Sequence, residues 1–352
     1  MANPNIGNSD VLVDDIFYLA EPFFQDGVIA QAVDEVVTNR GVSYFSAAGN
    51  NADRAYESTN FAVANDSESF FDDRFHDFDP GEGVDTRQSI TIDGGATVRL
   101  SLQWDDPFYT SDGVDTDLNI FLLESGTNNV VAGSTLDNKE AQIPVEVLGF
   151  TNPSDTAQEY DVAISLSAGA EPGRIKYVNF GSSVDFNEFG TNSPTIIGHA
   201  AAVNAQAIGA ARYTTPTDPE FFTALGPTNI LFNPDGTRKD TPEIRQNPDL
   251  TAINGTDNTF FGGSDLENNG FPNFFGTSAA APHAAAIAAL MEEANPDLSP
   301  QEVYDTLADT AIDIGSPGFD NLTGEGLIDA LKAVGVAAST AGQTHLKLSE
   351  NR

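Results

Sequence analysis

The sequence predicts an α/β fold whose parallel sheet is interrupted by an all-β module. Three observations lead to this prediction. Residues 10–50 read as a strand, a helix and a second strand in succession. From about Ala64 to Phe180 the chain consists of short alternating segments without helical periodicity, and from about Gly181 helical periodicity returns. Strands that alternate with helices are typical of a parallel sheet, and runs of short strands are typical of a sandwich.

The first segment contains a βαβ unit. Asp10 to Ala20 reads as a short apolar strand with an acidic middle. GVIAQAVDEVVTNRG has apolar residues at helical spacing, and Gly41 ends the predicted helix. VSYFSAAGNN follows as a strand of small and apolar residues that runs into a glycine turn. Two strands joined by a helix predict a parallel pair.

The middle segment predicts a β-sandwich or jelly roll of roughly seven strands. Turn signals such as DGG, SGTNN and NPSD separate these strands, and no helix is expected among them. We expect Trp104 to lie in the core of this module. The expected strands are SITID, TVRLSLQW, DLNIFLLE, NNVVAGS, QIPVEVLGF, EYDVAISLS and RIKYVNF.

The last segment returns to α/β character. HAAAVNAQAIGA is expected as a helix followed by a strand, and NPDLTAING as a strand that enters a turn. SAAAPHAAAIAALMEEA predicts a buried helix and GEGLIDALKAV a final one. Ser299, Pro300 and Glu302 predict a capping box at the start of a further helix. The predicted division is residues 1–62 (α/β), 63–180 (inserted sandwich), 181–338 (α/β) and 339–352 (tail).

The composition excludes several classes of function. The 352-residue chain has a formal net charge of -38, which argues against binding to nucleic acids or anionic membranes. This charge suits a solvated surface, a salty medium or carboxylate clusters that hold cations. The chain has no cysteine, which excludes disulfides, thiolate metal sites and cysteine catalysis. No stretch reaches the roughly 18 apolar residues that span a bilayer, and no secretory signal is visible.

Ser278 lies in the stretch GTSAAAPH, at the start of an apolar helix. Two interpretations of this serine are open. A hydroxyl at the beginning of a helix can cap the first backbone N–H groups. The same position also suits the nucleophile of an acyl-transfer enzyme, because the hydroxyl can face solvent and the helix N-terminus attracts negative charge.

Four motifs resemble those of the subtilisin-like serine peptidases. GTSAAAPH resembles the family's nucleophile motif, and FSAAGNN resembles the strand that ends in its oxyanion asparagine. NPDLTAING and GFDNLTGEGLIDALKAV are similar to two later segments of the family. The resemblance covers roughly residues 8–62 and 181–338. It implies an incomplete, doubly wound subtilisin-like sheet, the activity of a serine endopeptidase, and secretion from the cell.

The same resemblance implies roles for individual residues. Ser278 would attack the peptide carbonyl, and its backbone N–H would help to hold the oxyanion. The side-chain amide of Asn50 would be the second oxyanion donor. Ala47, Ala48 and Gly49 would form one wall of the pocket for the side chain that precedes the cleaved bond. The implied substrate-binding residues are Ala47, Ala48, Gly49, Gly276 and Thr277.

The catalytic His of the family has no counterpart at the expected place. The family's Asp and His motifs both precede the AAGN strand, and no histidine precedes Ala47 in this chain. His199 and His283 are similar to packing positions of the family. His76 lies in the predicted sandwich, and His345 lies in the tail.

Asp14 and Asp15 align with the family's substrate-binding edge rather than with its catalytic aspartate. The chain therefore resembles the C-terminal two-thirds of a subtilase, as a truncated or split reading frame would encode. We expect a peptidase that acts on protein or peptide substrates but lacks its base. A separate chain that supplies the Asp and His is one alternative, and a non-catalytic secreted binding protein is another. A subtilase-like sheet that lacks its N-terminal strands would have an exposed edge strand, so we expect poor solubility of the isolated chain.

The module between the two α/β segments resembles β-sandwich domains of bacterial secreted peptidases, through its W-x-D-P and D-x-D-L strands. Its acidic loop offers Asp112, Asp115 and Asp117 as weak calcium candidates. The spacing does not match an EF-hand loop, and a solvated acidic loop is the simpler interpretation. The sequence therefore predicts no obligatory cofactor.

Overall fold

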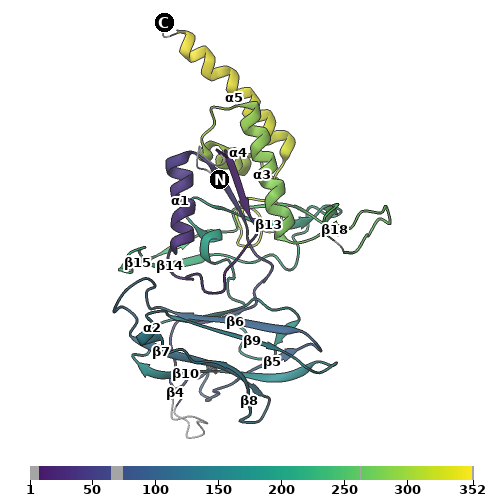
Figure 1. Cartoon of the computed structure of the whole chain (residues 1–352). Helices are drawn as coiled ribbons and strands as arrows, with labels where there is room; N and C mark the ends of the chain where they lie inside the picture. Colours follow the sequence, from purple (N-terminus) through teal and green to yellow (C-terminus); the bar gives the residue numbers. More distant parts are fainter. Residues whose placement is uncertain (1–7, 65–73, 262, 351–352) are drawn as a thin grey trace.

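The computed structural model describes residues 8–64, 74–261 and 263–350, with residues 342–350 described by their backbone alone. Figure 1 shows two parts of the molecule. One part carries the long helices around a small parallel sheet, and the other consists of antiparallel sheets that lie below it in this view. None of the described helices combines the length and the apolar character that crossing a membrane requires.

A four-stranded parallel sheet forms the centre of the helical part. β1 pairs with β2, β2 with β13, and β13 with β16, in each case parallel. The strands are β1 (Val11–Asp14), β2 (Ser43–Ala47), β13 (Gln206–Arg212) and β16 (Leu250–Asn254). Within the described residues no strand pairs with the outer side of β1, so β1 is an edge strand of this sheet.

The helix α1 (Val28–Arg40) joins β1 to β2 and confirms the predicted βαβ unit. It turns Ala30, Val33 and Val37 toward the sheet, where all three are buried. The helix ends at Gly41, whose φ of 66° lies in the left-handed region that favours glycine.

The helix α3 (Thr277–Ala294) is the buried helix that the sequence predicts. It packs against β2, β13 and β16 through fully buried alanines, including Ala280, Ala284 and Ala288. Because these side chains are small, the helix backbone approaches the sheet closely. This packing fixes where the first turn of α3 lies relative to the strand ends.

Two helices follow α3. α4 (Pro300–Thr310) begins with the predicted capping box, which is confirmed: Ser299 accepts a hydrogen bond from the Glu302 backbone, and Glu302 accepts one from the Ser299 backbone. α5 (Ala330–Glu350) starts within the expected final helix but runs on through most of the stretch expected as a tail. No proline interrupts that stretch, so nothing in its covalent geometry stops the helix.

The prediction of a helix in HAAAVNAQAIGA is wrong. The structure has a single 3₁₀ turn there, η1 (Gly198–Ala201), before β13 begins. Gly198 has a φ of 65° and Ala202 has left the helical region, so the alanine run cannot continue as a helix. Its alanines are buried as packing residues instead.

The antiparallel part has two sheets. The larger has the order β12-β5-β10-β7-β8, with β4 also paired to β10, and the smaller has the order β3-β11-β6-β9. All seven strands predicted in this region are present. The strands are β3 (Ala55–Ser58), β4 (Arg74–Phe75), β5 (Gln88–Ile92), β6 (Thr97–Trp104), β7 (Thr116–Glu124), β8 (Val130–Ser134), β9 (Val145–Thr151), β10 (Gln158–Gly169), β11 (Ile175–Asn179) and β12 (Val184–Phe186).

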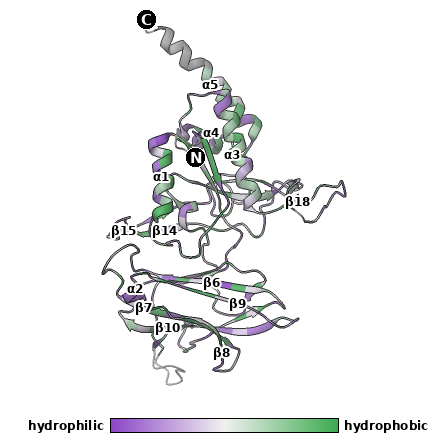
Figure 2. Cartoon of the chain, viewed as in Figure 1, coloured by the Kyte–Doolittle hydropathy of each residue, from purple (hydrophilic) through white to green (hydrophobic). Residues whose placement is uncertain are grey.

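Side chains from both antiparallel sheets share one hydrophobic core. Leu102 and Trp104 of β6 and Ile120 of β7 are fully buried in it, as the sequence predicts for Trp104. Figure 2 shows the hydrophobic residues of β7 in green, as it does those of β1. β3 and β12 lie outside the predicted bounds 63–180 but pair with β11 and β5. The region also contains one helical turn that was not expected, α2 (Asn138–Ala141).

Two small hairpins complete the structure. The first consists of β14 (Thr228–Phe232) and β15 (Arg238–Arg245), and the second of β17 (Thr256–Asp257) and β18 (Asn273–Phe274). Figure 1 shows the second hairpin and its loop extending away from the helical part.

Candidate active site

A pocket of about 320 Å³ lies where the two parts of the molecule meet. The ends of β1 and β2 and the start of α3 form its wall on the helical side, because the C-terminal ends of parallel strands share one edge of a sheet. Residues from the antiparallel part form the opposite wall. Almost all the residues predicted for the site line this pocket, namely Ala47, Ala48, Gly49, Asn50, Thr277 and Ser278.

Ser278 is the second residue of α3, so its interpretation as the N-cap is wrong. Gly276 occupies the N-cap position, and no side chain caps the helix. The φ of Gly276 is 122°, and a Cβ there would lie 3.4 Å from Asn50 Nδ2, so a glycine fits this position best. The Ser278 hydroxyl, free of a capping role, lies at the pocket and is half-buried.

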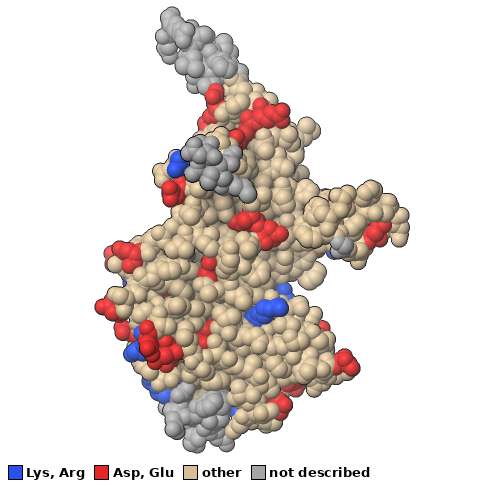
Figure 3. Space-filling view, in the orientation of Figure 1, with Lys and Arg blue, Asp and Glu red and all other residues tan. Residues whose placement is uncertain are grey.

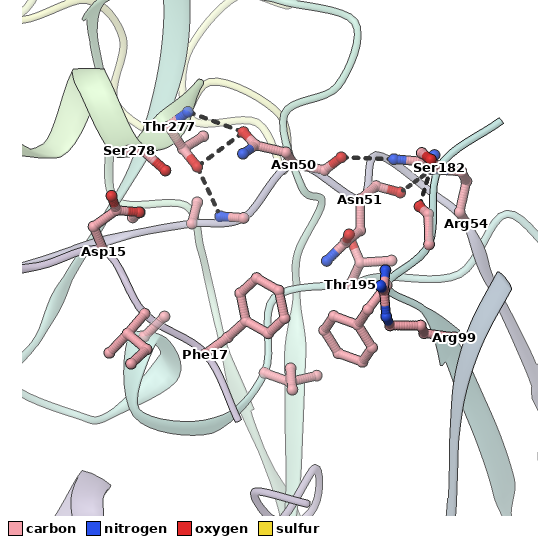
Figure 4. Close-up of a pocket in the computed structure, with 18 of the residues that line it drawn as sticks. Asp15, Phe17, Asn50, Asn51, Arg54, Arg99, Ser182, Thr195, Thr277 and Ser278 are labelled. Carbon is pink, nitrogen blue, oxygen red and sulfur yellow. Dashed lines mark hydrogen bonds between the residues drawn. The ribbon is translucent and has the colours of Figure 1, made fainter. Parts of the chain in front are cut away.

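The side chain of Asn50 is held in one orientation by Thr277. Asn50 Oδ1 accepts hydrogen bonds from the Thr277 backbone N–H at 2.9 Å and from the Thr277 hydroxyl at 3.1 Å. Thr277 Oγ1 in turn accepts a hydrogen bond from the Gly49 backbone N–H at 3.1 Å. Since Oδ1 is used in this way, the Nδ2 group of Asn50 is the part left to donate to a bound molecule, and no described protein acceptor takes it (Figure 4).

Asp15, which the resemblance to subtilases assigns to the substrate-binding edge, lines the same pocket as Ser278. Its carboxylate faces Ser278 in Figure 4, and the serine side chain favours the charged form of this carboxylate. Burial raises the pKa of Asp15, the nearby Ser278 side chain lowers it, and the charge of Asp14 raises it again, so the net shift is upward. The only sequence signal for this contact is that Asp15 directly follows β1, at the same sheet edge as Asn50.

His199 also lines the pocket, but two carboxylates hold it. Its Nδ1 lies 2.8 Å from Glu21 Oε2, and its Nε2 lies 3.2 Å from Asp14 Oδ2. Burial alone would lower the pKa of His199, but the adjacent carboxylates of Asp14 and Glu21 raise it to about 10. A histidine that is protonated at neutral pH has no lone pair with which to accept the proton of a serine.

Asp14 is itself held from several sides. Its carboxylate accepts hydrogen bonds from the hydroxyls of Tyr44 and Ser46, the latter at 2.7 Å. Burial would raise the pKa of Asp14, but His199 and these hydroxyls bring it below its ordinary value. The sequence interpretation of His199 as a packing residue is therefore incomplete, because the side chain is buried as the cation of an ion-paired cluster.

His76 and His283 do not line this pocket. His76 lies 2.7 Å from the Tyr56 hydroxyl among aromatic rings of the antiparallel part, and burial lowers its pKa to about 4. His283 Nδ1 bonds to the Ala279 carbonyl at 2.7 Å within α3. The side chain of His345 falls outside the described residues.

Within the described residues, no group of three or more His, Asp or Glu side chains has the arrangement of a metal site. Asp117 Oδ1 accepts a hydrogen bond from the Asn138 backbone, and Asp112 lies on an exposed loop. Calcium binding by Asp112, Asp115 and Asp117 therefore stays a prediction.

Comparison with known sequences gives one family. The profile described as "Subtilase family" matches residues 130–326, which is more than half of the chain. The chain is 37% identical over 67 residues to "Extracellular serine protease" of Serratia marcescens, covering 19% of this chain and 6% of that protein. It is also 37% identical over 67 residues to "Alkaline elastase YaB" of Bacillus sp. (strain YaB), covering 19% of this chain and 17% of that protein. The matched stretch is thus a small part of each relative's length.

Among solved structures, the chain is similar to that of the Clostridium perfringens CspB protease. The match has 13% sequence identity and a TM-score of 0.48, and it covers 93% of this chain and 66% of that one.

Proposed function

Because this chain belongs to the subtilase family, we propose that it is a serine-type endopeptidase with Ser278 as its nucleophile. The observation that supports this most directly is the position of the Ser278 hydroxyl. It lies in the first turn of α3, in a pocket, with the oriented Asn50 amide on one side and the Asp15 carboxylate on the other (Figure 4).

The proposed reaction proceeds through an acyl-enzyme. Ser278 Oγ attacks the peptide carbonyl carbon, and the carbonyl oxygen becomes an oxyanion. Asn50 Nδ2 and the Ser278 backbone N–H donate hydrogen bonds to that oxyanion, and the N-terminus of α3 favours the negative charge. The C–N bond then breaks, the amine leaves with a proton, and water hydrolyses the ester to release the acid and regenerate Ser278.

Asp15 is the base that this chain itself offers. Its carboxylate faces the Ser278 side chain (Figure 4), and the raised pKa of Asp15 makes that carboxylate a stronger base than an ordinary aspartate. Asp15 would take the hydroxyl proton during attack and give it to the departing amine. In the alternative version, the Asp and His typical of the family come from a separate chain and Asp15 only borders the substrate.

The residues around Ser278 and Asn50 would bind the substrate. Ala47, Ala48 and Gly49 would form a wall of the pocket for the side chain before the cleaved bond. The fully buried Thr277 and the glycine conformation at Gly276 keep bulk away from the substrate backbone. Secretion is proposed as well, since one relative is named an extracellular protease.

A non-catalytic binding protein is the second candidate. Its support is the state of His199, which two carboxylates hold and which is therefore no substitute for a catalytic histidine. In this version the pocket binds a peptide without cleaving it. The proposal that the two antiparallel sheets form an inserted module is compatible with either function.

Hydrolysis of casein by the purified chain separates these candidates. We expect activity that Ser278→Ala abolishes and that Ser125→Ala, the same change at an exposed serine outside the pocket, leaves intact. If a well-folded chain shows no hydrolysis, co-expression with a chain that carries the family's Asp and His motifs tests the two-chain version. Failure of both experiments would leave the binding function.

A further inference from the structure

The wall of the pocket opposite Ser278 carries two arginines, Arg54 and Arg99. This is unusual in a chain with only 15 Lys and Arg residues against 53 Asp and Glu. Figure 3 shows blue Lys and Arg atoms in the notch between the two parts of the molecule, on a face where most charged atoms are red. Most of the described cationic side chains form ion pairs with carboxylates. Those that do not are Arg40, Arg54, Arg99 and Lys139.

Arg54 is fixed in place by backbone carbonyls rather than by carboxylates. It donates from NH2 to Asn50 O at 2.7 Å, from Nε to Asn51 O at 3.2 Å and from NH1 to Gly181 O at 3.4 Å. Partial burial lowers the pKa of Arg54, and the charges of Asp53 and Asp185 raise it again. Neutral acceptors orient this guanidinium but do not cancel its charge, and two of its five N–H groups remain without a described acceptor.

Arg99 projects from β6 with its side chain exposed. Its backbone is tied to the neighbouring strand, because Arg99 N donates to Asn179 Oδ1 at 3.2 Å and Arg99 O accepts from Phe180 N at 2.8 Å. Within the described part of the chain its guanidinium donates to no acceptor. The base of this side chain is therefore rigid, and its charge is available to a ligand.

An apolar surface lies between Arg99 and Ser278. The rings of Phe17 and Phe180 stack with centroids 5.1 Å apart, and both residues line the pocket. Figure 4 shows Phe17 between Ser278 and Arg99. A ligand that reaches from Ser278 to the Arg99 guanidinium passes the Phe17 ring (Figure 4). This arrangement suits a side chain with methylene groups followed by a negative charge.

We infer that this pocket receives an acidic side chain, with glutamate preferred over aspartate, from the residue that precedes the cleaved bond. The inference rests on the proposed function, which places that residue along the Ala47–Gly49 wall. A guanidinium binds a carboxylate with two parallel hydrogen bonds, and such charge-assisted bonds are stronger than neutral ones. The net charge of -38 repels strongly acidic peptides at long range, so the expected substrate has a single acidic residue at this position.

Binding to an inactive variant tests this without requiring catalysis. In the Ser278→Ala background, calorimetry would compare acetyl-Ala-Ala-Ala-Glu-amide with the same peptide ending in Gln. We expect the Glu peptide to bind about tenfold more tightly, as a charge-assisted contact gives. Adding Arg99→Gln should bring the ratio close to one. Adding Lys139→Gln, which removes an exposed unpaired cation outside the pocket, should leave the ratio unchanged.

Equal binding of the two peptides, binding of neither, or a preference that survives both Arg99→Gln and Arg54→Gln would overturn the inference. Failure of the inference can be distinguished from failure of the proposed function. A chain that hydrolyses casein but does not discriminate between the peptides retains the function and loses the acidic preference. A chain that prefers the Glu peptide but never hydrolyses casein retains the site as a binding site.

Discussion

Asn50 Oδ1 accepts two hydrogen bonds from Thr277, one from its backbone N–H at 2.9 Å and one from its hydroxyl at 3.1 Å. These bonds join the end of β2 to the first turn of α3, across 227 positions of sequence. They also decide which end of the Asn50 amide faces the pocket. The geometry of the proposed oxyanion site therefore depends on a residue that need not touch the substrate.

Thr277→Val tests this dependence. The substitution keeps the shape of a fully buried side chain but removes the hydroxyl that binds Asn50 and accepts from the Gly49 backbone. We expect a loss of about 2 kcal/mol in the free energy of unfolding, because the Gly49 N–H is left unpaired. Thr277→Ser keeps the hydroxyl and serves as the control in denaturant titrations. Equal stability of the valine and wild-type proteins would contradict this account.

Asn50→Ala tests the oxyanion role. We expect the rate of Ser278 phosphonylation by a fluorophosphonate to fall about 100- to 1000-fold, the range found for loss of one such donor. Asn51→Ala is the matched control, since Asn51 is the neighbouring asparagine in the same pocket. A rate that falls equally in both variants would assign the effect to general damage of the loop.

Asp15→Asn tests the base. A base acts in its ionised form, so the labelling rate should rise with pH through the pKa of Asp15, which lies above the ordinary 3.8. In the asparagine variant this rising limb should be absent and the rate low throughout. Asp112→Asn, on an exposed loop, should leave the profile unchanged. A limb that persists in Asp15→Asn would show that another group takes the proton.

His199→Gln tests whether this histidine is structural. Removing the cation leaves the Asp14 and Glu21 carboxylates facing each other, so we expect a loss of about 3 kcal/mol of stability at neutral pH. The folded-state pKa of about 10 exceeds the ordinary 6.5, so this contribution is complete below pH 6.5 and is lost as the pH rises toward 10. Unfolding titrations at several pH values measure both effects. Unchanged stability with abolished labelling would instead make His199 a catalytic base.

Much of the fold could be predicted because it follows from local patterns. The valines of α1 at helical spacing, Gly41 at its end and the capping box at Ser299 all act within a few residues of themselves. The alternating strands of the antiparallel part are equally local. The error at η1 arose because an alanine run has high helix propensity, whereas the positive φ of Gly198 and the burial of the alanines decide the outcome.

Only the site residues that belong to a sequence motif could be predicted. The sequence brought Asn50 and Ser278 to attention through GTSAAAPH and FSAAGNN, and the structure places both at one pocket. No local sequence pattern indicates that Asp15 lies beside Ser278, because the two residues are far apart in the sequence. The His199–Glu21 pair, 178 positions apart, is invisible for the same reason.

The central claim is that Ser278 is an activated nucleophile within this chain. The most direct measurement is fluorophosphonate labelling of the purified protein, followed by mass spectrometry of the modified peptide. The account predicts one adduct, on Ser278, that is lost in Ser278→Ala and slowed in Asp15→Asn while both variants remain folded by circular dichroism. A well-folded protein that acquires no adduct, or acquires it on another serine, would contradict the claim.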